Sequence, residues 1–228
     1  MKALAFSGGK DSMACLHLLR DELDCAIFVD SGFAYPETLA LVDYAKTIVR
    51  TVIVRSDRAG QNKREGVPAD VVPIDWTRLG HALSGAKDVM VQSYLGCCYE
   101  NLFVPLHAEA KRMGVTRLYI GQRSEEAHKS QLQSGAVVDG IERIYPIEDW
   151  TEAQVFSYLA EKMTVPAHYS IRHSSLDCYD CTAYREDSQD RVQWTKIKHP
   201  LFYAAYASRA RALDDAVAQA MRGQQCLA

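Results

Sequence analysis

The sequence predicts an α/β fold in which a doubly wound, mostly parallel five-stranded sheet carries helices on both faces. Short apolar runs alternate with segments whose apolar residues recur at helical spacing, and short polar loops join them. Parallel strands need crossover connections, usually helices, so this alternation indicates a parallel sheet. With 228 residues and 48% hydrophobic content, the chain can bury one sizeable core.

The elements are expected in the order strand, loop, helix. Thr151 is expected to cap a helix, because its hydroxyl can accept from exposed backbone N–H groups. Residues 58–85 are polar with scattered Gly and Pro, and they predict an irregular connection that is a candidate mobile lid. The predicted strands are 2–6, 25–29, 51–55 and 117–120, with a further apolar run at 144–147, and the predicted helices are 13–23, 36–48, 89–113, 152–163 and 201–221.

Charge and targeting features exclude several classes of protein. The formal net charge is −3 and the sequence pI is about 6.2, which argues against coating nucleic acid by bulk electrostatics. The amino-terminal apolar run is too short for a secretory signal, and no stretch approaches a membrane span. We therefore expect a cytoplasmic protein without a membrane partner. Its seven cysteines would lie in a reducing compartment, where clustered thiols bind metal or act chemically, while Cys15 and Cys25 are expected to be buried structural thiols.

The segment SGGKDS, residues 7–12, lies between the first predicted strand and its helix. Glycines let a backbone approach a ligand closely, a helix N-terminus adds partial positive charge, and Lys10 adds a full charge. The Walker A spacing is absent, and a tight turn with a serine cap is the alternative interpretation. We predict a phosphate-binding loop, because ligands of parallel sheets bind at the carboxyl ends of the strands.

This loop and three later segments resemble known families. SGGKDS is the signature of the PP-loop nucleotide pyrophosphatases, which split ATP between its α and β phosphates. Residues 30–38, DSGFAYPET, resemble a segment of the phosphoadenosine phosphosulfate (PAPS) reductases and of the related sulfate adenylyltransferase subunit. GQRSEE at 121–126 and YPIEDWT at 145–151 are similar to two more segments of these proteins. Together the segments span nearly the whole chain in the order of the PAPS and adenosine phosphosulfate (APS) reductase family.

The resemblance implies that the substrate is an adenine nucleotide, either ATP or APS/PAPS, and that Mg²⁺ binds with it. Arg123 is expected to face the α-phosphate or sulfate, and a guanidinium at a strand tip suits bidentate contact with an oxyanion. Asp30 ends its strand at the same edge of the sheet. The ribose, a metal ion and the loop itself are alternative partners for its carboxylate. The implied nucleotide-binding residues are Ser7, Gly8, Gly9, Lys10, Asp11, Ser12, Asp30, Gly121 and Arg123. Lys10, Asp11 and Arg123 are also the expected catalytic groups.

We expect a division of the chain near residue 165. Residues 1–165 would form the PP-loop nucleotide-binding α/β domain. Residues 166–228 are irregular, aromatic and cysteine-bearing before the last helix, and they would pack on the same domain.

Two pairs of cysteines have the spacing of a metal site. Cys97 and Cys98 are adjacent, and Cys178 and Cys181 form a CxxC pair about eighty residues later. Four thiolates suit zinc or an iron–sulfur cluster, and the residues alone do not separate the two. The pattern resembles the 4Fe-4S site of assimilatory APS reductases, which implies a 4Fe-4S cluster. The lysine that the resemblance implies shortly after the first pair is missing, so the resemblance does not extend to the usual electrostatic coupling of cluster and substrate.

The expected reaction depends on the loop and on the end of the chain. The reductases use a cysteine in an ECGLH-type tail to attack sulfur, and a thioredoxin-like reductant then releases sulfite. Here the corresponding segment is QQCLA, in which Cys226 has no adjacent base or cation to activate it. The reductases usually have a degraded PP-loop, whereas this loop is intact. The sequence therefore favours an ATP-pyrophosphatase type of sulfur transfer, with acceptor adenylylation, pyrophosphate departure aided by Mg²⁺ and Lys10, and displacement of AMP by a sulfur donor.

Two other hypotheses stay open at this point. One is a thioredoxin-dependent APS or PAPS reductase with Cys226 as nucleophile, and the other is a nucleotide- or redox-sensing module without turnover. A nucleic-acid acceptor is a further interpretation, because iron–sulfur PP-loop enzymes modify tRNA and DNA, and a homo-oligomer is equally open. The basic residues considered for phosphate contacts, with an ordinary solvated surface as the alternative for each, are Lys63, Arg64, Arg172, Arg185 and Arg191.

Overall fold

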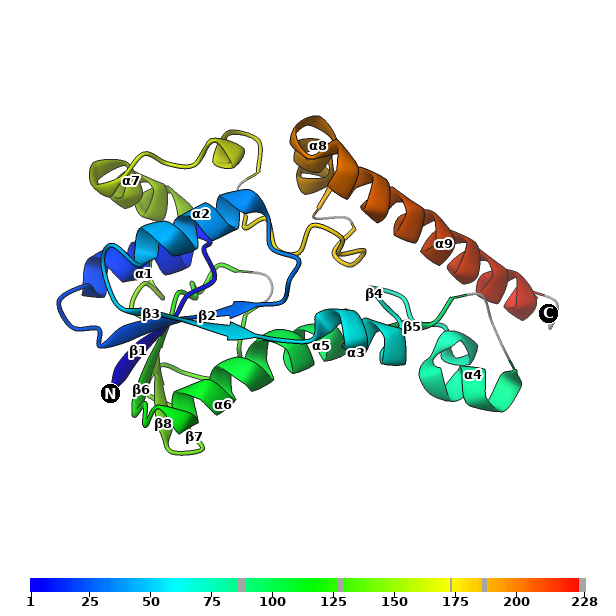
Figure 1. The fold of residues 1–228 in the computed structure, drawn as a ribbon, viewed down its shortest axis with the longest axis horizontal. Coiled ribbons are helices and arrows are strands. Elements are labelled where there is room, and N and C mark those ends of the chain that lie inside the picture. Colours follow the sequence, from blue (N-terminus) through cyan, green and yellow to red (C-terminus); the bar gives the residue numbers. More distant parts are fainter. Residues whose placement is uncertain (86–88, 127–128, 173, 186–187, 226–228) are drawn as a thin grey trace. The chain divides into compact units, whose positions relative to one another are not determined.

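The computed structural model describes residues 1–228 except 86–88, 127–128, 173, 186–187 and 226–228 (Figure 1). It has two compact units, each built from separate stretches of chain. The first unit contains Met1–Asp30, Ala34–Arg55 and Phe103–Leu176, and the second contains Ser31–Phe33, Ser56–Leu102 and Asp177–Ala228. The boundary expected near residue 165 stays a prediction.

The first unit is built on a six-stranded sheet with the order β3-β2-β1-β6-β8-β7. Each neighbouring pair among the first five strands is parallel, and only β7 pairs antiparallel, at the edge. The prediction of a mostly parallel sheet is therefore confirmed. Its fifth parallel strand, β8, overlaps the predicted apolar run at 144–147 only at Ile144, and β7 is a two-residue addition at the edge. The bounds are β1 Lys2–Ala5, β2 Cys25–Asp30, β3 Thr51–Arg55, β6 Arg117–Ile120, β7 Val137–Val138 and β8 Ile141–Ile144.

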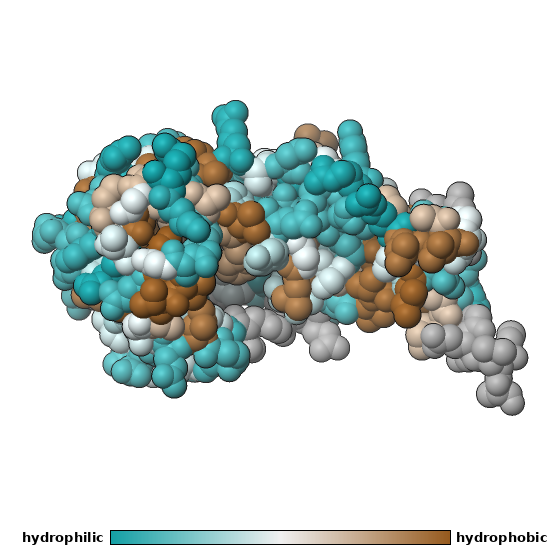
Figure 2. Space-filling view, turned by 90° about the horizontal axis from the view of Figure 1, so that it is seen from below, coloured by the Kyte–Doolittle hydropathy of each residue, from teal (hydrophilic) through white to brown (hydrophobic). Residues whose placement is uncertain are grey.

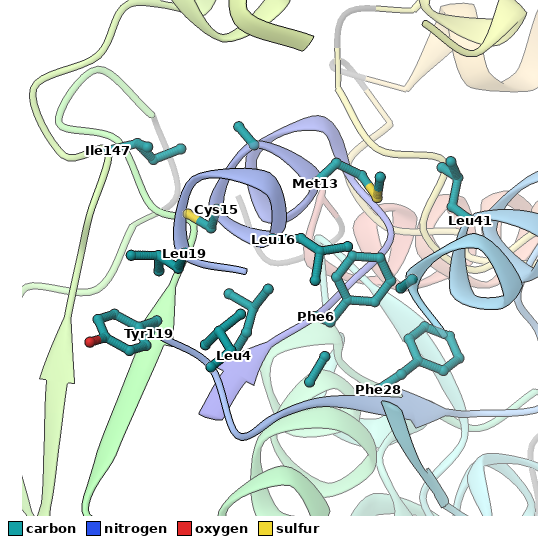
Figure 3. Packing of buried hydrophobic residues seen from close by; sticks show 14 of the residues in the cluster. Leu4, Phe6, Met13, Cys15, Leu16, Leu19, Phe28, Leu41, Tyr119 and Ile147 are labelled. Carbon is teal, nitrogen blue, oxygen red and sulfur yellow. The ribbon is translucent and has the colours of Figure 1, made fainter. Parts of the chain in front are cut away.

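Helices cover both faces of this sheet, as the alternation in the sequence predicts (Figure 1). On one face α1, α2 and α7 pack over side chains that include Leu4 and Phe28, and Figure 3 shows Met13 and Leu16 of α1 above them. On the other face α6 places Ala110 against Ile27. Successive strand residues point to opposite faces, so each short strand serves both layers. The helices are α1 Lys10–Leu19, α2 Pro36–Ala45, α6 Val104–Arg112 and α7 Glu152–Lys162, followed by the 3₁₀ turn η3 Ala167–Ser170.

The start of α7 follows the expected capping chemistry. The Thr151 hydroxyl accepts from the Gln154 N–H, and the Gln154 side chain accepts from the Thr151 N–H, which completes a capping box. The helix ends one residue before the predicted limit. The predicted N-terminal cap is confirmed.

The second unit corrects the prediction of an irregular connection at residues 58–85. Its buried residues include Trp76, Val91 and Leu213, which pack around the two-stranded parallel sheet β4-β5. The sequence signal was weak because α3 is polar and its buried face carries Arg, Gln and Asn instead of apolar residues. The elements are α3 Arg58–Glu65, β4 Val67–Ala69, the 3₁₀ turn η1 Ile74–Trp76, α4 Arg78–Ser84, β5 Val91–Ser93, α5 Tyr94–Cys98, α8 Gln189–Lys198 and α9 Pro200–Gln225.

The predicted helix at 89–113 is wrong in its first part and interrupted in its middle. Residues 91–93 form β5, and the π-helical turn Tyr99–Phe103 separates α5 from α6. Single π-helical turns occur frequently at functional sites, and this one directly follows Cys97 and Cys98. The terminal helix α9 is confirmed and is longer than predicted.

Apolar side chains also reach the surface. Figure 2 shows brown apolar patches between hydrophilic teal ones, and large exposed residues include Ile74, Leu79 and Leu83 of the second unit. No helix in the described part of the chain combines the length and apolarity that a membrane crossing requires.

Leu16 provides a test of the first unit's core. It is fully buried beneath α1, whereas Leu18 of the same helix is 41% exposed. We expect Leu16→Ala to lower the free energy of unfolding by about 2–5 kcal/mol, because it removes apolar contacts and leaves a cavity. Leu18→Ala should change it by less than about 0.5 kcal/mol. Urea unfolding followed by circular dichroism measures both, and equal effects would contradict this packing.

Candidate functional site

Three parallel strands bring the expected nucleotide-binding segments to one edge of the first unit. β1 pairs with β2 on one side and with β6 on the other. Their carboxyl ends therefore lie together, and they lead into the loop 7–9, Asp30 and the segment 121–126 respectively. This is the edge at which ligands of parallel sheets bind.

The loop at the end of β1 is held by its own serines. Gly8 has a φ of +76°, a left-handed conformation that glycine adopts without steric cost. The Ser7 hydroxyl accepts from the Gly9 N–H at 3.2 Å, and the Ser12 hydroxyl donates to the Gly9 carbonyl at 2.9 Å. These hydrogen bonds fix the loop at the N-terminus of α1.

Lys10 is buried at the first position of α1, and its charge is neutralised by two carboxylates. Its Nζ lies 3.0 Å from Asp11 Oδ2 and 3.3 Å from Glu152 Oε1. Its backbone N–H donates to the hydroxyl of Tyr169 at 2.6 Å. No local pattern of residues marks Tyr169, which lies 159 residues away along the chain.

Arg123 lies on the other side of Asp11. Its Nε donates to Asp11 Oδ1 at 2.7 Å, and its guanidinium also forms an ion pair with Glu125. Burial by itself would lower the pKa of Arg123, but the charge of Asp11, and to a smaller degree of Glu126 and Glu125, raises it above the ordinary arginine value. Asp11 therefore joins the two cations of the site through its two carboxylate oxygens.

Carboxylates outnumber cations around the loop. Two basic side chains, Lys10 and Arg123, are paired with four acidic ones, Asp11, Glu125, Glu126 and Glu152. Burial and the neighbouring Asp11 charge raise the pKa of Glu126, although the Arg123 N–H opposes this. An anionic nucleotide needs additional positive charge here, or some carboxylates must turn away from it.

Gly121 fixes how closely β6 approaches the loop. A Cβ at this position would lie 2.7 Å from the carbonyl carbon of Asp11 and 2.8 Å from the amide nitrogen of Ser12. Only glycine permits this backbone approach, which aligns Arg123 with Asp11. The structure thus brings together all of the predicted loop residues, Gly121 and Arg123, and it places Asp30 at the end of the adjacent strand.

The four paired cysteines all belong to the second unit. Cys97 and Cys98 end α5, and Cys178 and Cys181 lie in the loop before α8. The Cys178 sulfur lies 3.5 Å from the Ser31 hydroxyl. Arg191 donates to the carbonyls of Cys178 and Cys181 at 2.8 and 2.9 Å and so fixes the CxxC turn.

The cysteine thiols are close enough to influence one another's ionisation. Burial, followed by the charges of Cys181, Cys97 and Cys178, raises the pKa of Cys98 to about 12. Burial also raises the pKa of Cys181 to about 12, against the opposing charge of Arg191. Among the residues that the structure describes, no three His, Cys, Asp or Glu side chains already have a metal-binding arrangement.

Two arginines add positive charge beside this cysteine group. Arg58 of α3 donates to Asp180 Oδ1 at 2.5 Å, and Arg209 of α9 is paired with the other oxygen of Asp180. Burial alone would lower the pKa of Arg58, but the thiolate form of Cys178, the Asp180 carboxylate and the thiolate form of Cys97 raise it. Arg58 was not among the predicted site residues, because residues 58–85 were expected to be irregular.

The remaining candidate residues have different surroundings. Arg172 and Arg191 are buried and donate to backbone carbonyls, so the interpretation of an ordinary solvated surface is wrong for both. Their contact with phosphate stays a prediction. Lys63 and Arg64 are exposed, and Arg185 is paired with Asp214. Cys226, the candidate nucleophile, lies outside the described residues.

The close approach at Gly121 generates a prediction. Gly121→Ala should lower the free energy of unfolding by about 1–3 kcal/mol, because the new methyl group must push apart two backbone segments. Gly96→Ala is the control, since a Cβ there meets nothing within 4 Å. Thermal unfolding measures both variants, and equal melting temperatures for Gly121→Ala and the unmodified protein would contradict the approach of β6 to the loop.

Glu126 generates a prediction of pH dependence. Its pKa in the folded state is raised above the ordinary value of 4.5. Between the ordinary pKa and the raised folded-state pKa, the folded state binds more protons than the unfolded state, so stability falls as pH rises. Glu126→Gln removes the penalty of the charged form. We expect a higher melting temperature than the unmodified protein at pH 8 and a difference that shrinks as pH falls towards 4.5. A difference that grows on acidification would show that the charge of Glu126 stabilises the fold.

Comparison with known proteins identifies one matching domain family and several similar reductases. Residues 2–184 match the phosphoadenosine phosphosulfate reductase domain. A phosphoadenosine 5'-phosphosulfate reductase of Alkalilimnicola ehrlichii is 26% identical over 72% of this chain and 62% of its own length. An adenosine 5'-phosphosulfate reductase of Deinococcus radiodurans is 26% identical over 72% of this chain and 58% of its own length. The chain thus spans about 60% of the length of these curated relatives.

A solved structure, the phosphoadenylyl-sulfate reductase of Candida auris in complex with phosphate, is 22% identical, with a TM-score of 0.45 over 70% of this chain and 72% of that one. The domain match at residues 2–184 covers well over half of the sequence. It includes the loop, the Arg123 segment and all four paired cysteines. The chain therefore belongs to the phosphoadenosine phosphosulfate reductase family.

Proposed function

We propose that the chain is a sulfonucleotide reductase, which binds APS or PAPS at the loop of the first unit and releases sulfite with a thioredoxin-like reductant. The observation that carries this proposal is the pair of buried cations, Lys10 and Arg123, on either side of Asp11 at the strand edge of a family member. A lysine and a planar guanidinium suit the adjacent phosphate and sulfate groups of such a nucleotide.

The reaction needs a nucleophilic thiol. Its thiolate attacks the sulfate sulfur, an S–S bond forms, and the S–O bond to the nucleotide phosphate breaks, so that the adenosine phosphate departs with the electron pair. One thiol of the reductant then attacks the enzyme sulfur, and sulfite departs with the electron pair of the S–S bond. The second thiol of the reductant attacks the resulting mixed disulfide, which frees the enzyme thiol and leaves the reductant as a disulfide. Lys10 and Arg123 would stabilise the charge that develops on the departing phosphate. Cys226 is the proposed nucleophile.

We also propose a 4Fe-4S cluster in the second unit, held by Cys97, Cys98, Cys178 and Cys181. The donor set fits this group, because iron–sulfur clusters are held by four cysteine thiolates. The four cysteines belong to one unit, and the thiolate forms of Cys181, Cys97 and Cys178 influence the ionisation of Cys98. The buried cation Arg58 interacts with Cys178 and Cys97. Their present arrangement must tighten for all four to act as ligands. When bound, such a cluster supplies redox-active iron and inorganic sulfide. Zinc is the alternative occupant of four thiolates.

The surplus of carboxylates favours a second candidate function, ATP-dependent sulfur transfer. Two cations face four acidic side chains around the loop, and a triphosphate would add further negative charge. Mg²⁺ relieves this repulsion, since it binds carboxylates and nucleotide phosphates together. In this reaction an acceptor oxygen attacks the α-phosphate of ATP, pyrophosphate departs, and a sulfur donor then displaces AMP.

One assay separates the two functions. Purified protein is incubated with APS, with PAPS, or with ATP and Mg²⁺, in the presence of a dithiol reductant, and both sulfite and pyrophosphate are measured. We expect sulfite from APS or PAPS and its loss in Cys226→Ser. Pyrophosphate from ATP without sulfite would establish the second function, and tight nucleotide binding without either product would indicate a sensing module.

Lys10 tests the binding site in either case. Lys10→Met should weaken nucleotide binding at least about tenfold, because it removes the buried charge that faces the phosphates and leaves Asp11 and Glu152 without their partner. Lys111→Met is the control, since Lys111 is exposed in the same unit. Isothermal titration calorimetry measures both, and unchanged affinity in Lys10→Met would place the nucleotide elsewhere.

A further inference from the structure

We propose that one buried polar face of α3 holds the cysteine centre, with Arg58 and Asn62 donating N–H groups to its sulfur atoms. They act as positioning residues for the cluster, and the inference rests on the cluster proposed above. Removing either donor is expected to lower the reduction potential of the cluster and to speed its loss. This role is separate from the nucleotide chemistry of Lys10 and Arg123.

The two residues share a face of α3. They are four positions apart, so their side chains project from the same side of the helix. Arg58 is 2% exposed and Asn62 is 8% exposed. This helix contacts α5, which carries Cys97 and Cys98. A polar side of a helix is thus turned inwards towards the thiols.

Each residue has a buried donor that no acceptor in the described part of the chain satisfies. These donors are Nη2 of Arg58 and Nδ2 of Asn62. A buried N–H without a partner is destabilising, and such groups are uncommon in folded proteins. Two of them on one helix face, near the sulfur atoms of Cys97 and Cys178, point to sulfur as the intended acceptor.

Both pairs of cysteines lie within the influence of this face. The Cys97 thiol donates to Asn62 Oδ1 at 3.6 Å, and the charge of Arg58 interacts with both Cys178 and Cys97. The guanidinium of Arg58 is held in place by Asp180 and lies 4.5 Å from the centre of the Phe33 ring. Asn101 adds a third donor, 3.9 Å from the Cys97 sulfur. Contacts within the second unit therefore hold these donors in place.

Hydrogen bonds to sulfur offset the negative charge that thiolates bring to a metal centre. They raise the reduction potential of iron–sulfur clusters, and loss of such a partner commonly costs 10- to 100-fold in metal affinity. Arg58 supplies such a buried cation from α3.

The experiment compares Arg58→Gln, Arg58→Lys and Asn62→Leu with the unmodified protein, all purified anaerobically. Asn62→Leu removes the donor without adding a charge, and Gln92 Nε2 keeps its hydrogen bonds to Gln61 and Gly66. Arg78→Gln is the matched control, because Arg78 is an exposed arginine of the same unit that pairs with Glu65 at the end of α3. Iron and sulfide content, the reduction potential and the rate of iron loss to a chelator are measured.

We expect the reduction potential to fall in Arg58→Gln and Asn62→Leu, with about tenfold faster iron loss. Arg58→Lys should be intermediate, and Arg78→Gln should match the unmodified protein. Thermal unfolding of the metal-free forms identifies a variant that fails to fold, and if Arg58→Gln fails, Asn62→Leu decides the outcome. Unchanged potential and iron loss would overturn this inference alone, whereas unmodified protein without iron would overturn the cluster proposal as well.

Discussion

The parallel pairing of β1 with both β2 and β6 is the constraint on which the nucleotide site depends. It brings three strand ends together, although about 90 residues separate the end of β2 from the start of β6. Gly121 then allows the backbone after β6 to touch the start of α1. The salt bridge between Arg123 and Asp11 follows from this approach, because a larger residue at 121 would move the guanidinium away from the loop.

The charges at that edge determine what the site can bind. Lys10 and Arg123 are both buried, and both form ion pairs with Asp11, so neither positive charge is available to a phosphate without competition. A nucleotide must compete with these ion pairs or arrive with Mg²⁺. This competition makes the choice between a sulfonucleotide and ATP a matter of charge balance, and it explains why an intact loop does not by itself select the substrate.

The second unit has a different organisation, in which polar groups occupy part of the interior. Arg58, Asn62 and Gln92 are buried around the cysteines, and Asp180 joins Arg58 to Arg209. Burying such groups is costly unless they are hydrogen-bonded. Their presence beside four thiols is consistent with a centre that gains negative charge when metal binds, since fixed donors and a buried cation then become favourable.

The sequence by itself determined the strand and helix alternation of the first unit, the loop between β1 and α1, the cap at Thr151 and the two cysteine pairs, because each is a local pattern of residue types. It did not determine α3 or the roles of Arg58, Glu152 and Tyr169. A polar helix has no apolar periodicity to reveal it, and a contact between residues more than 100 positions apart leaves no local trace. Only the tertiary structure decided these features, because burial and charge pairing depend on which distant segments the sheet and the helices bring together.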